Sequence, residues 1–143
     1  MSAADTVITQ QFTAYLVLGL ESECCLEFSL TAAFDPRDPY AVRLHFPVPQ
    51  GPDDADLSWT FGRELLASGL SEPSGDGDVH VWPCGPDLAM VELRSDTGSA
   101  LIALPDREVR AFLFRSYAEV PPGYESDYLE LDRLLHDLLM GRA

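Results

Sequence analysis

Lysine is absent from this sequence, and basic charge of any kind is scarce. The nine basic residues are all arginine and stand against 24 aspartates and glutamates, which gives a formal net charge of −15. Nucleic acids and anionic membranes both attract proteins through basic side chains, which neutralise their phosphates. The charge balance therefore disfavours both as partners, unless the arginines gather on one face.

Long apolar runs and cysteines are also scarce. No run approaches the ~20 apolar residues that a membrane-spanning helix needs, so we predict no direct membrane insertion. The three cysteines are Cys24, Cys25 and Cys84, and an odd count with two adjacent members argues against a disulfide framework. The N-terminal MSAADTVITQQ lacks the basic and apolar segments of a signal peptide. We therefore expect reduced thiols and a cytoplasmic protein.

Apolar residues as a whole are plentiful, and they predict a folded chain. Hydrophobic residues make up 46% of the 143 residues, which is typical of globular proteins. A chain of this length buries about 70% of the surface that its unfolded form exposes, so it needs no metal or disulfide to fold. We expect one domain over residues 1–143, with residues 1–9 as a flexible N-terminal segment.

Apolar residues at every second position predict strands over most of the chain. In residues 40–48, one face holds Tyr40, Val42, Leu44 and Phe46, and the other holds Arg43 and His45. The sequence SDTG at 95–98 predicts a hairpin turn. The expected strands are 11–20, 24–34, 40–48, 57–61, 79–83, 88–94 and 99–104.

A helical period appears in three later segments. In residues 62–70, Leu65, Leu66 and Leu70 can share a face, and Gly69 is a candidate for the C-terminal stop. A second helix opens at Pro105 and ends before PPG at 121–123. A third runs to residue 140, and Asp127 with Glu130 resembles a capping box at its start. The sequence thus predicts an α+β fold of antiparallel sheets with a short inserted helix and two C-terminal helices.

The two C-terminal helices carry more apolar surface than contact with one sheet requires. The second helix has an apolar face of Val109, Phe112 and Leu113, and Phe114 and Tyr117 point away from it. The last helix has a wide stripe formed by Tyr128, Leu131, Leu134, Leu135, Leu138 and Leu139. Such surplus apolar surface is typical of a subunit or partner interface.

The sequence SGDGDVHVWP at 74–83 has the composition of a ligand loop or of a turn. A phosphate loop would lead into a helix and contain a lysine, and a calcium loop would end in a distal glutamate. Neither pattern is met, so we favour a turn in which Gly77 adopts a positive φ and the aspartates cap the backbone.

Catalytic and metal-binding patterns are weak throughout. His80 and Cys84 supply two possible ligands, whereas structural zinc usually takes four. There is no GxSxG nucleophile motif, and His136 lies on a helix face that we expect to be solvated. A hydrolase with His80 or His136 beside a serine and a carboxylate is the least favoured alternative. We predict no enzyme, no metal and no cofactor.

Three segments read in order resemble the SsgA-like proteins, small sporulation and cell-division factors of actinomycete bacteria. They are DPYAVRLHF (38–46), WTFGRELLASGLSEPSGDGDVHVWP (59–83) and VPPGYESDYLELDRLL (120–135). The motif residues that carry the resemblance include Asp38, Pro39, Tyr40, Trp59, Phe61, Leu65, Leu66, Gly69, Gly77, Asp78, Val79, Trp82 and Pro83. FGREL resembles one branch of the family and VHVWP another, so the subtype stays open.

The resemblance implies a fold and a function beyond what the residues show. It implies a whirly-like fold of antiparallel sheets and helices, a homotrimer, and no enzymatic activity. It also implies a role at division septa, with the tubulin-like division protein FtsZ or other SsgA-like proteins as partners. Our interface candidates are Arg63 and Glu64, taken as exposed, with Phe114 and Tyr117.

A whirly-like single-stranded nucleic-acid binder is the main alternative function, and it rests on fold analogy alone. Such a binder needs a positive groove with stacking aromatics. Trp59, Trp82 and Tyr40 could stack, but the groove would have to come from nine arginines among 24 acids. Nucleic acid is therefore the less favoured partner.

Overall fold

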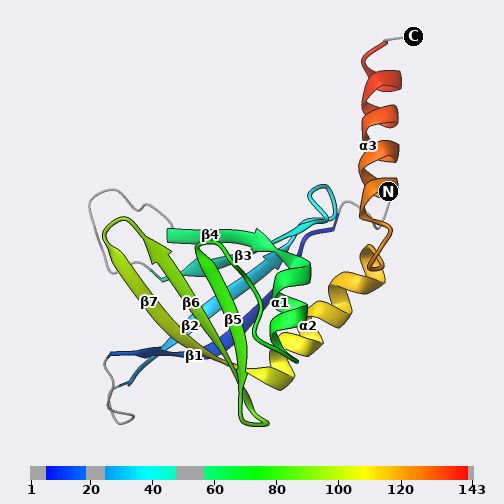
Figure 1. Cartoon of the computed structure of the whole chain (residues 1–143). Helices are drawn as coiled ribbons and strands as arrows, with labels where there is room; N and C mark the ends of the chain where they lie inside the picture. The colour runs from blue at the N-terminus through cyan, green and yellow to red at the C-terminus, as the bar shows by residue number, and fades with distance from the viewer. Residues whose placement is uncertain (1–5, 19–24, 48–56, 142–143) are drawn as a thin grey trace.

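The computed structural model describes residues 6–18, 25–47 and 57–141, and these contain seven strands and three helices (Figure 1). Each predicted strand and helix is present, with boundaries that differ by a few residues. In chain order the elements are β1 (Ile8–Val17), β2 (Cys25–Phe34), β3 (Ala41–Phe46), β4 (Leu57–Gly62), α1 (Arg63–Gly69), β5 (Val79–Cys84), β6 (Leu88–Ser95), β7 (Gly98–Pro105), α2 (Asp106–Glu119) and α3 (Glu125–Leu139).

Some expectations fall where nothing is described. Cys24 and the acidic loop at 49–56 lie outside the described residues. The N-terminal segment 1–9 is described only from residue 6. Because β1 begins at Ile8, the end of that segment is a strand, which corrects the prediction of a flexible segment at residues 8 and 9.

The described strands form one strongly curled antiparallel sheet (Figure 1), which corrects the prediction of more than one sheet. The strand order is β4-β3-β2-β1-β7-β6-β5, so β4 and β5 are the two end strands. Consecutive strands pair with one another except β4 and β5, which α1 separates in the chain. The turn predicted at 95–98 joins Ser95 to Gly98 across β6 and β7. This arrangement confirms the α+β class.

Alternation decides which strand residues enter the core. In β3, Val42 and Leu44 are buried while Arg43 is exposed, as period two predicts. Tyr40 is the exception on this face, because it precedes the strand and is exposed. The buried face is completed from other strands by Phe12, Leu30, Phe34, Val81, Val91 and Ile102.

Helices α1 and α2 cover the buried face of the sheet. In α2, Val109, Phe112 and Leu113 are buried, as predicted, and Phe112 meets Phe12 of β1 edge to face with ring centroids 6.3 Å apart. In α1, Leu66 is buried, and Leu70 follows it into the core. Helix α1 contacts both β4 and β5 as well as α2.

Two glycines act differently from the prediction. Gly69 is the last residue of α1, but a Cβ built on it would lie 2.3 Å from the Cβ of Val81, so its role is close helix–strand packing rather than a left-handed stop. Gly77 lacks a positive φ, and it is Gly75 that adopts φ 105°. The loop is a turn, as predicted, but its strained position lies two residues earlier.

Helix α3 extends away from the rest of the molecule (Figure 1). It begins at Glu125 after Tyr124, and no side chain caps it. The predicted capping box of Asp127 and Glu130 is therefore wrong, because both residues lie inside the helix. Glu125 instead accepts a hydrogen bond from the backbone N–H of Gly123 at 2.9 Å, which satisfies a donor just before the helix.

Candidate functional site

Arg63, predicted as an exposed interface residue, is buried at the start of α1 with 2% of its side chain exposed. Its guanidinium carbon lies 4.7 Å from the ring centroid of Phe34 and 5.0 Å from that of Tyr117. It also donates to the carbonyl oxygen and the hydroxyl of Ser116, each at 3.3 Å, and to Glu125 at 3.1 Å. Arg63 therefore joins α1, α2 and α3 and is unavailable to a partner.

The surroundings of Arg63 offset the cost of burying a charge. A guanidinium between aromatic faces gains cation–π stabilisation, and a carboxylate partner supplies the opposite charge. Partial burial raises the pKa of Glu125, but the hydrogen bonds from backbone N–H groups and from Arg63 outweigh it and hold the pKa below its usual value. Burial raises the pKa of Tyr117, and the Arg63 charge opposes that rise. Tyr117 is half-buried and packs against the core, so it is not the surplus aromatic that we predicted.

A groove beside α1 gathers the motif residues that the resemblance singled out. Its volume is about 660 Å³. Trp59, Thr60 and Phe61 of β4 form one wall, and residues 74–79 form the other. Glu64, Leu65 and Ser68 of α1 complete the lining. We call this the α1 groove. The two longest motif stretches, far apart in the sequence, therefore face one another across it.

A second hollow lies on the other flank of α1, with a volume of about 340 Å³. Tyr40, Tyr117, Pro122, Gly123 and Glu125 contribute to it. Glu64 lines both this hollow and the α1 groove, and it is exposed, as we predicted. Glu64 is therefore the interface candidate of α1 that the geometry retains.

The remaining motif residues serve the backbone or the core. Pro39 is buried and Asp38 exposed in the turn before β3, and Leu66 is buried under the sheet. Trp82 and Pro83 are half-buried on β5. Gly69 packs against Val81. None of these residues lines the α1 groove.

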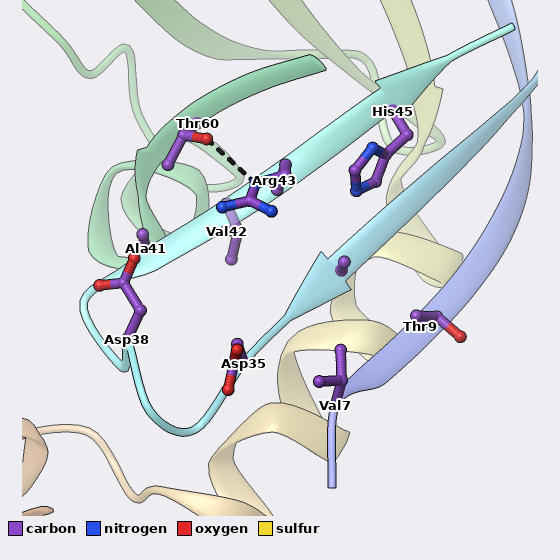
Figure 2. A pocket seen from close by; sticks show the side chains of 10 residues that line it. Val7, Thr9, Asp35, Asp38, Ala41, Val42, Arg43, His45 and Thr60 are labelled. Atoms are coloured by element: carbon purple, nitrogen blue, oxygen red, sulfur yellow. Dashed lines mark hydrogen bonds between the residues drawn. The ribbon is translucent and has the colours of Figure 1, made fainter. Parts of the chain in front are cut away.

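A third pocket, of about 260 Å³, is lined by residues of β1, β2, β3 and β4 and of the turn before β3 (Figure 2). Arg43 donates to the Thr60 hydroxyl at 3.3 Å, and His45 lies farther along the same strand (Figure 2). Asp35 lines the pocket and pairs with Arg37 at 3.1 Å. Burial raises the pKa of Asp35, but the Arg37 bonds outweigh it and leave it lowered. The sequence showed the polar face of residues 40–48, but it did not show that this face lines the same pocket as Asp35.

The residues considered for metal binding or catalysis do not come together. His80 pairs with Glu92 at 3.3 Å, and Cys25 and Cys84 are exposed free thiols on separate strands. Within the described ranges, no group of His, Cys, Asp or Glu could hold a metal ion. His136 is exposed on α3, as predicted. Among the described helices, none is long and apolar enough to cross a membrane.

The apolar stripe of α3 is exposed. Leu131 and Leu134 expose 54% and 56% of their surface, and Leu138 exposes 62%. On α2, Phe114 is 75% exposed, as predicted for a surplus aromatic residue. Tyr128 is the member of the predicted stripe that packs against the core. The stripe and Phe114 therefore leave apolar side chains exposed on both helices.

Comparison with known proteins identifies the family. The model of the family described as "Streptomyces sporulation and cell division protein, SsgA" matches residues 28–125, which include the α1 groove and Arg63. The chain belongs to the SsgA family. The resemblance seen in the sequence motifs is thereby confirmed.

Relatives within the SsgA family match over nearly the whole chain. The sporulation-specific cell division protein SsgB of Frankia casuarinae is 44% identical, over 95% of this chain and 96% of its own length. SsgB of Streptomyces coelicolor is 39% identical, over 87% of this chain and 91% of its own. The crystal structure of an SsgA-like sporulation-specific cell division protein from Thermobifida fusca shares 32% identity with a TM-score of 0.82, covering 96% of this chain and 98% of that one.

Proposed function

We propose that this SsgA-family chain is a non-enzymatic regulator of sporulation-specific cell division that acts by protein–protein contact. The observation that carries the proposal is membership of the family together with relatives named sporulation-specific cell division proteins. Its direct task would be septum-site selection or recruitment of the tubulin-like division protein FtsZ. The action would take place in the cytoplasm at division septa.

The surface of the molecule supports a contact function. The α1 groove brings the family motifs to one place, and the α3 stripe leaves leucines in contact with solvent. Exposed apolar surface of this kind marks interaction sites. The arginines support this reading over nucleic-acid binding, because Arg63 is buried and Arg94 and Arg110 pair with acids.

The test is a binding titration in which FtsZ from the same organism is added to the fluorescently labelled, purified chain. Fluorescence anisotropy measures the binding. Saturable binding is the expected result. In the control, an excess of unlabelled chain is added, and it must displace the labelled chain from FtsZ. If no binding is detected while the chain is folded and FtsZ polymerises normally, the recruitment proposal fails and another sporulation partner must be sought.

We also propose that the chain works as a homotrimer in which the α3 stripe contacts neighbouring copies. Because Leu131, Leu134 and Leu138 expose only 54% to 62% of their surface, burying the exposed part would stabilise the assembly by about 1 kcal/mol or a little more each. Light scattering after size exclusion measures the mass. The triple variant Leu131→Ser, Leu134→Ser, Leu138→Ser is expected to be monomeric.

The matched control for this variant changes the opposite side of α3, with Arg133→Ser and His136→Ser. Both residues are exposed, and helical spacing places Arg133 opposite Leu131 and His136 opposite Leu134. The control is expected to keep the mass of the parent chain. A parent chain that is monomeric at micromolar concentration would remove the trimer from the proposal.

A further inference from the structure

The curled sheet leaves a seam between its two end strands. β4 and β5 end the strand order, and α1 contacts both of them (Figure 1). The α1 groove lies in this seam, since it is lined by Trp59–Phe61 on one side and by Val79 at the start of β5 on the other. The groove therefore lies where the sheet could accept one more strand.

The β4 edge of the seam lacks two of the usual protections against strand addition, proline and charged side chains. β4 pairs with β3 on one side only, and its sequence LSWTFG has no proline and no charged residue. Trp59, Thr60 and Phe61 all line the groove, although successive side chains point to opposite faces of a sheet. Consecutive residues line one groove when it runs along the strand edge. An end strand whose outer backbone groups are unpaired is a template for pairing.

The β5 edge, in contrast, is blocked. Ser74 already pairs with Val81 there, through backbone hydrogen bonds of 2.8 and 3.0 Å. Pro83, farther along β5, has no N–H to donate. Of the two strand edges that meet at the seam, β4 is therefore the one that can accept a new strand.

The charge of the groove indicates what kind of strand it accepts. Glu64, Asp76 and Asp78 line the groove and are exposed, and no arginine or histidine lines it. In the part of the chain that the structure describes, none of these three acids forms an ion pair, whereas Asp35, Asp106 and Glu125 each do. Trp59 adds an aromatic face that a cation can contact.

We propose that the α1 groove binds an extended basic segment of a partner protein, which adds to β4 as a further strand. Backbone pairing would supply affinity, and lysines or arginines of the segment would meet the three acids and Trp59. The proposal rests on the proposed function only in that the partner is a protein. A second copy of this chain is a poor occupant, because the net charge is −15 and edge-to-edge pairing would bring equal acids together.

The probe is a fluorescein-labelled peptide of about six residues, the usual strand length, in which Arg alternates with Val. Fluorescence anisotropy measures its dissociation constant. The variant Glu64→Gln, Asp76→Asn, Asp78→Asn is expected to weaken binding about tenfold, since each exposed ion pair contributes ~0.2–1 kcal/mol. The matched control, Asp87→Asn, Asp96→Asn, Glu108→Gln, removes the same charge from exposed sites outside the groove and should bind like the parent chain.

Two further peptides and one exchange measurement test strand addition itself. Replacing Arg by Glu, or methylating alternate backbone nitrogens, should each abolish binding without any change to the protein. Hydrogen exchange of residues 57–62 should slow when the Arg–Val peptide saturates. Absence of peptide binding, equal affinity for the groove and control variants, or protection elsewhere but not in 57–62 would each overturn the inference.

The groove and the proposed function can fail separately. If the parent chain and the groove variant bind FtsZ equally well, the proposed function stands. The α1 groove is then not the site that binds FtsZ, which overturns the inference for that partner. If the chain binds the Arg–Val peptide at β4 but not FtsZ, the groove is supported and the partner named in the function is wrong.

Discussion

Arg63 links three helices through one guanidinium. It begins α1, donates to Ser116 of α2 and pairs with Glu125 of α3. A charge buried to this extent is stable only while its partners stay in place. Arg63 therefore serves cohesion in this chain, which is why we expect its loss to reduce stability before it affects any partner.

Arg63→Ala is expected to lower the free energy of unfolding by about 3–5 kcal/mol. It removes the charge partner of Glu125 and leaves a cavity between the rings of Phe34 and Tyr117. Urea denaturation measures the change. A double-mutant cycle with Glu125→Gln should give a coupling energy of about 1 kcal/mol or more. Strictly additive effects would show that the pair, although 3.1 Å apart, does not stabilise the fold.

Glu125 makes part of the stability dependent on pH. Its pKa is lowered in the folded chain, against about 4.3 for an unfolded glutamate. Its contribution is therefore complete above about pH 4.3 and is lost as the pH falls through the lower folded value. The stability gap between the parent chain and Glu125→Gln should be constant at neutral pH and shrink below pH ~4.3. The Glu130→Gln variant, exposed on α3, should show no such gap.

Gly69 and Gly77 allow a matched comparison. A Cβ at Gly69 would lie 2.3 Å from Val81, whereas a Cβ at Gly77 would meet nothing within 4 Å. Gly69→Ala is expected to cost about 1–3 kcal/mol by overpacking, despite the better helix propensity of alanine. Gly77→Ala should change stability by no more than about 0.5 kcal/mol. Thermal unfolding of both variants checks this order, and equal melting temperatures would contradict it.

At the scale of the elements, α2 and α3 bury their apolar faces differently. Phe112 of α2 is fully buried, whereas Leu134 of α3 is 56% exposed. Phe112→Ala should cost about 3–5 kcal/mol in any assembly state. Leu134→Ala should cost less than about 0.5 kcal/mol in the dilute monomer and show a larger cost only when copies associate. Unfolding measured over a range of chain concentrations separates the two cases.

At the scale of the whole molecule, the sequence predicted the elements better than their contacts. Period-two and helical patterns located the strands and helices because burial of one face acts locally. The buried state of Arg63 was missed because its partners Phe34, Ser116 and Glu125 come from distant segments. The α1 groove was missed for the same reason, since the sequence showed both motif stretches but not the curl of the sheet that brings β4 beside residues 74–79.

The net charge of −15 gives the two proposed interfaces opposite responses to salt. Copies of an acidic chain repel one another, and salt screens that repulsion, so raising NaCl from about 0.1 M to about 1 M should tighten self-association through the apolar α3 stripe. The same change should weaken the Arg–Val peptide severalfold, because its ion pairs with Glu64, Asp76 and Asp78 are exposed and screened. Over one series of NaCl concentrations, light scattering measures self-association and fluorescence anisotropy measures peptide binding, so both directions of change are tested. A peptide affinity that rises with salt would mean that apolar contact, and not charge, holds the segment in the groove.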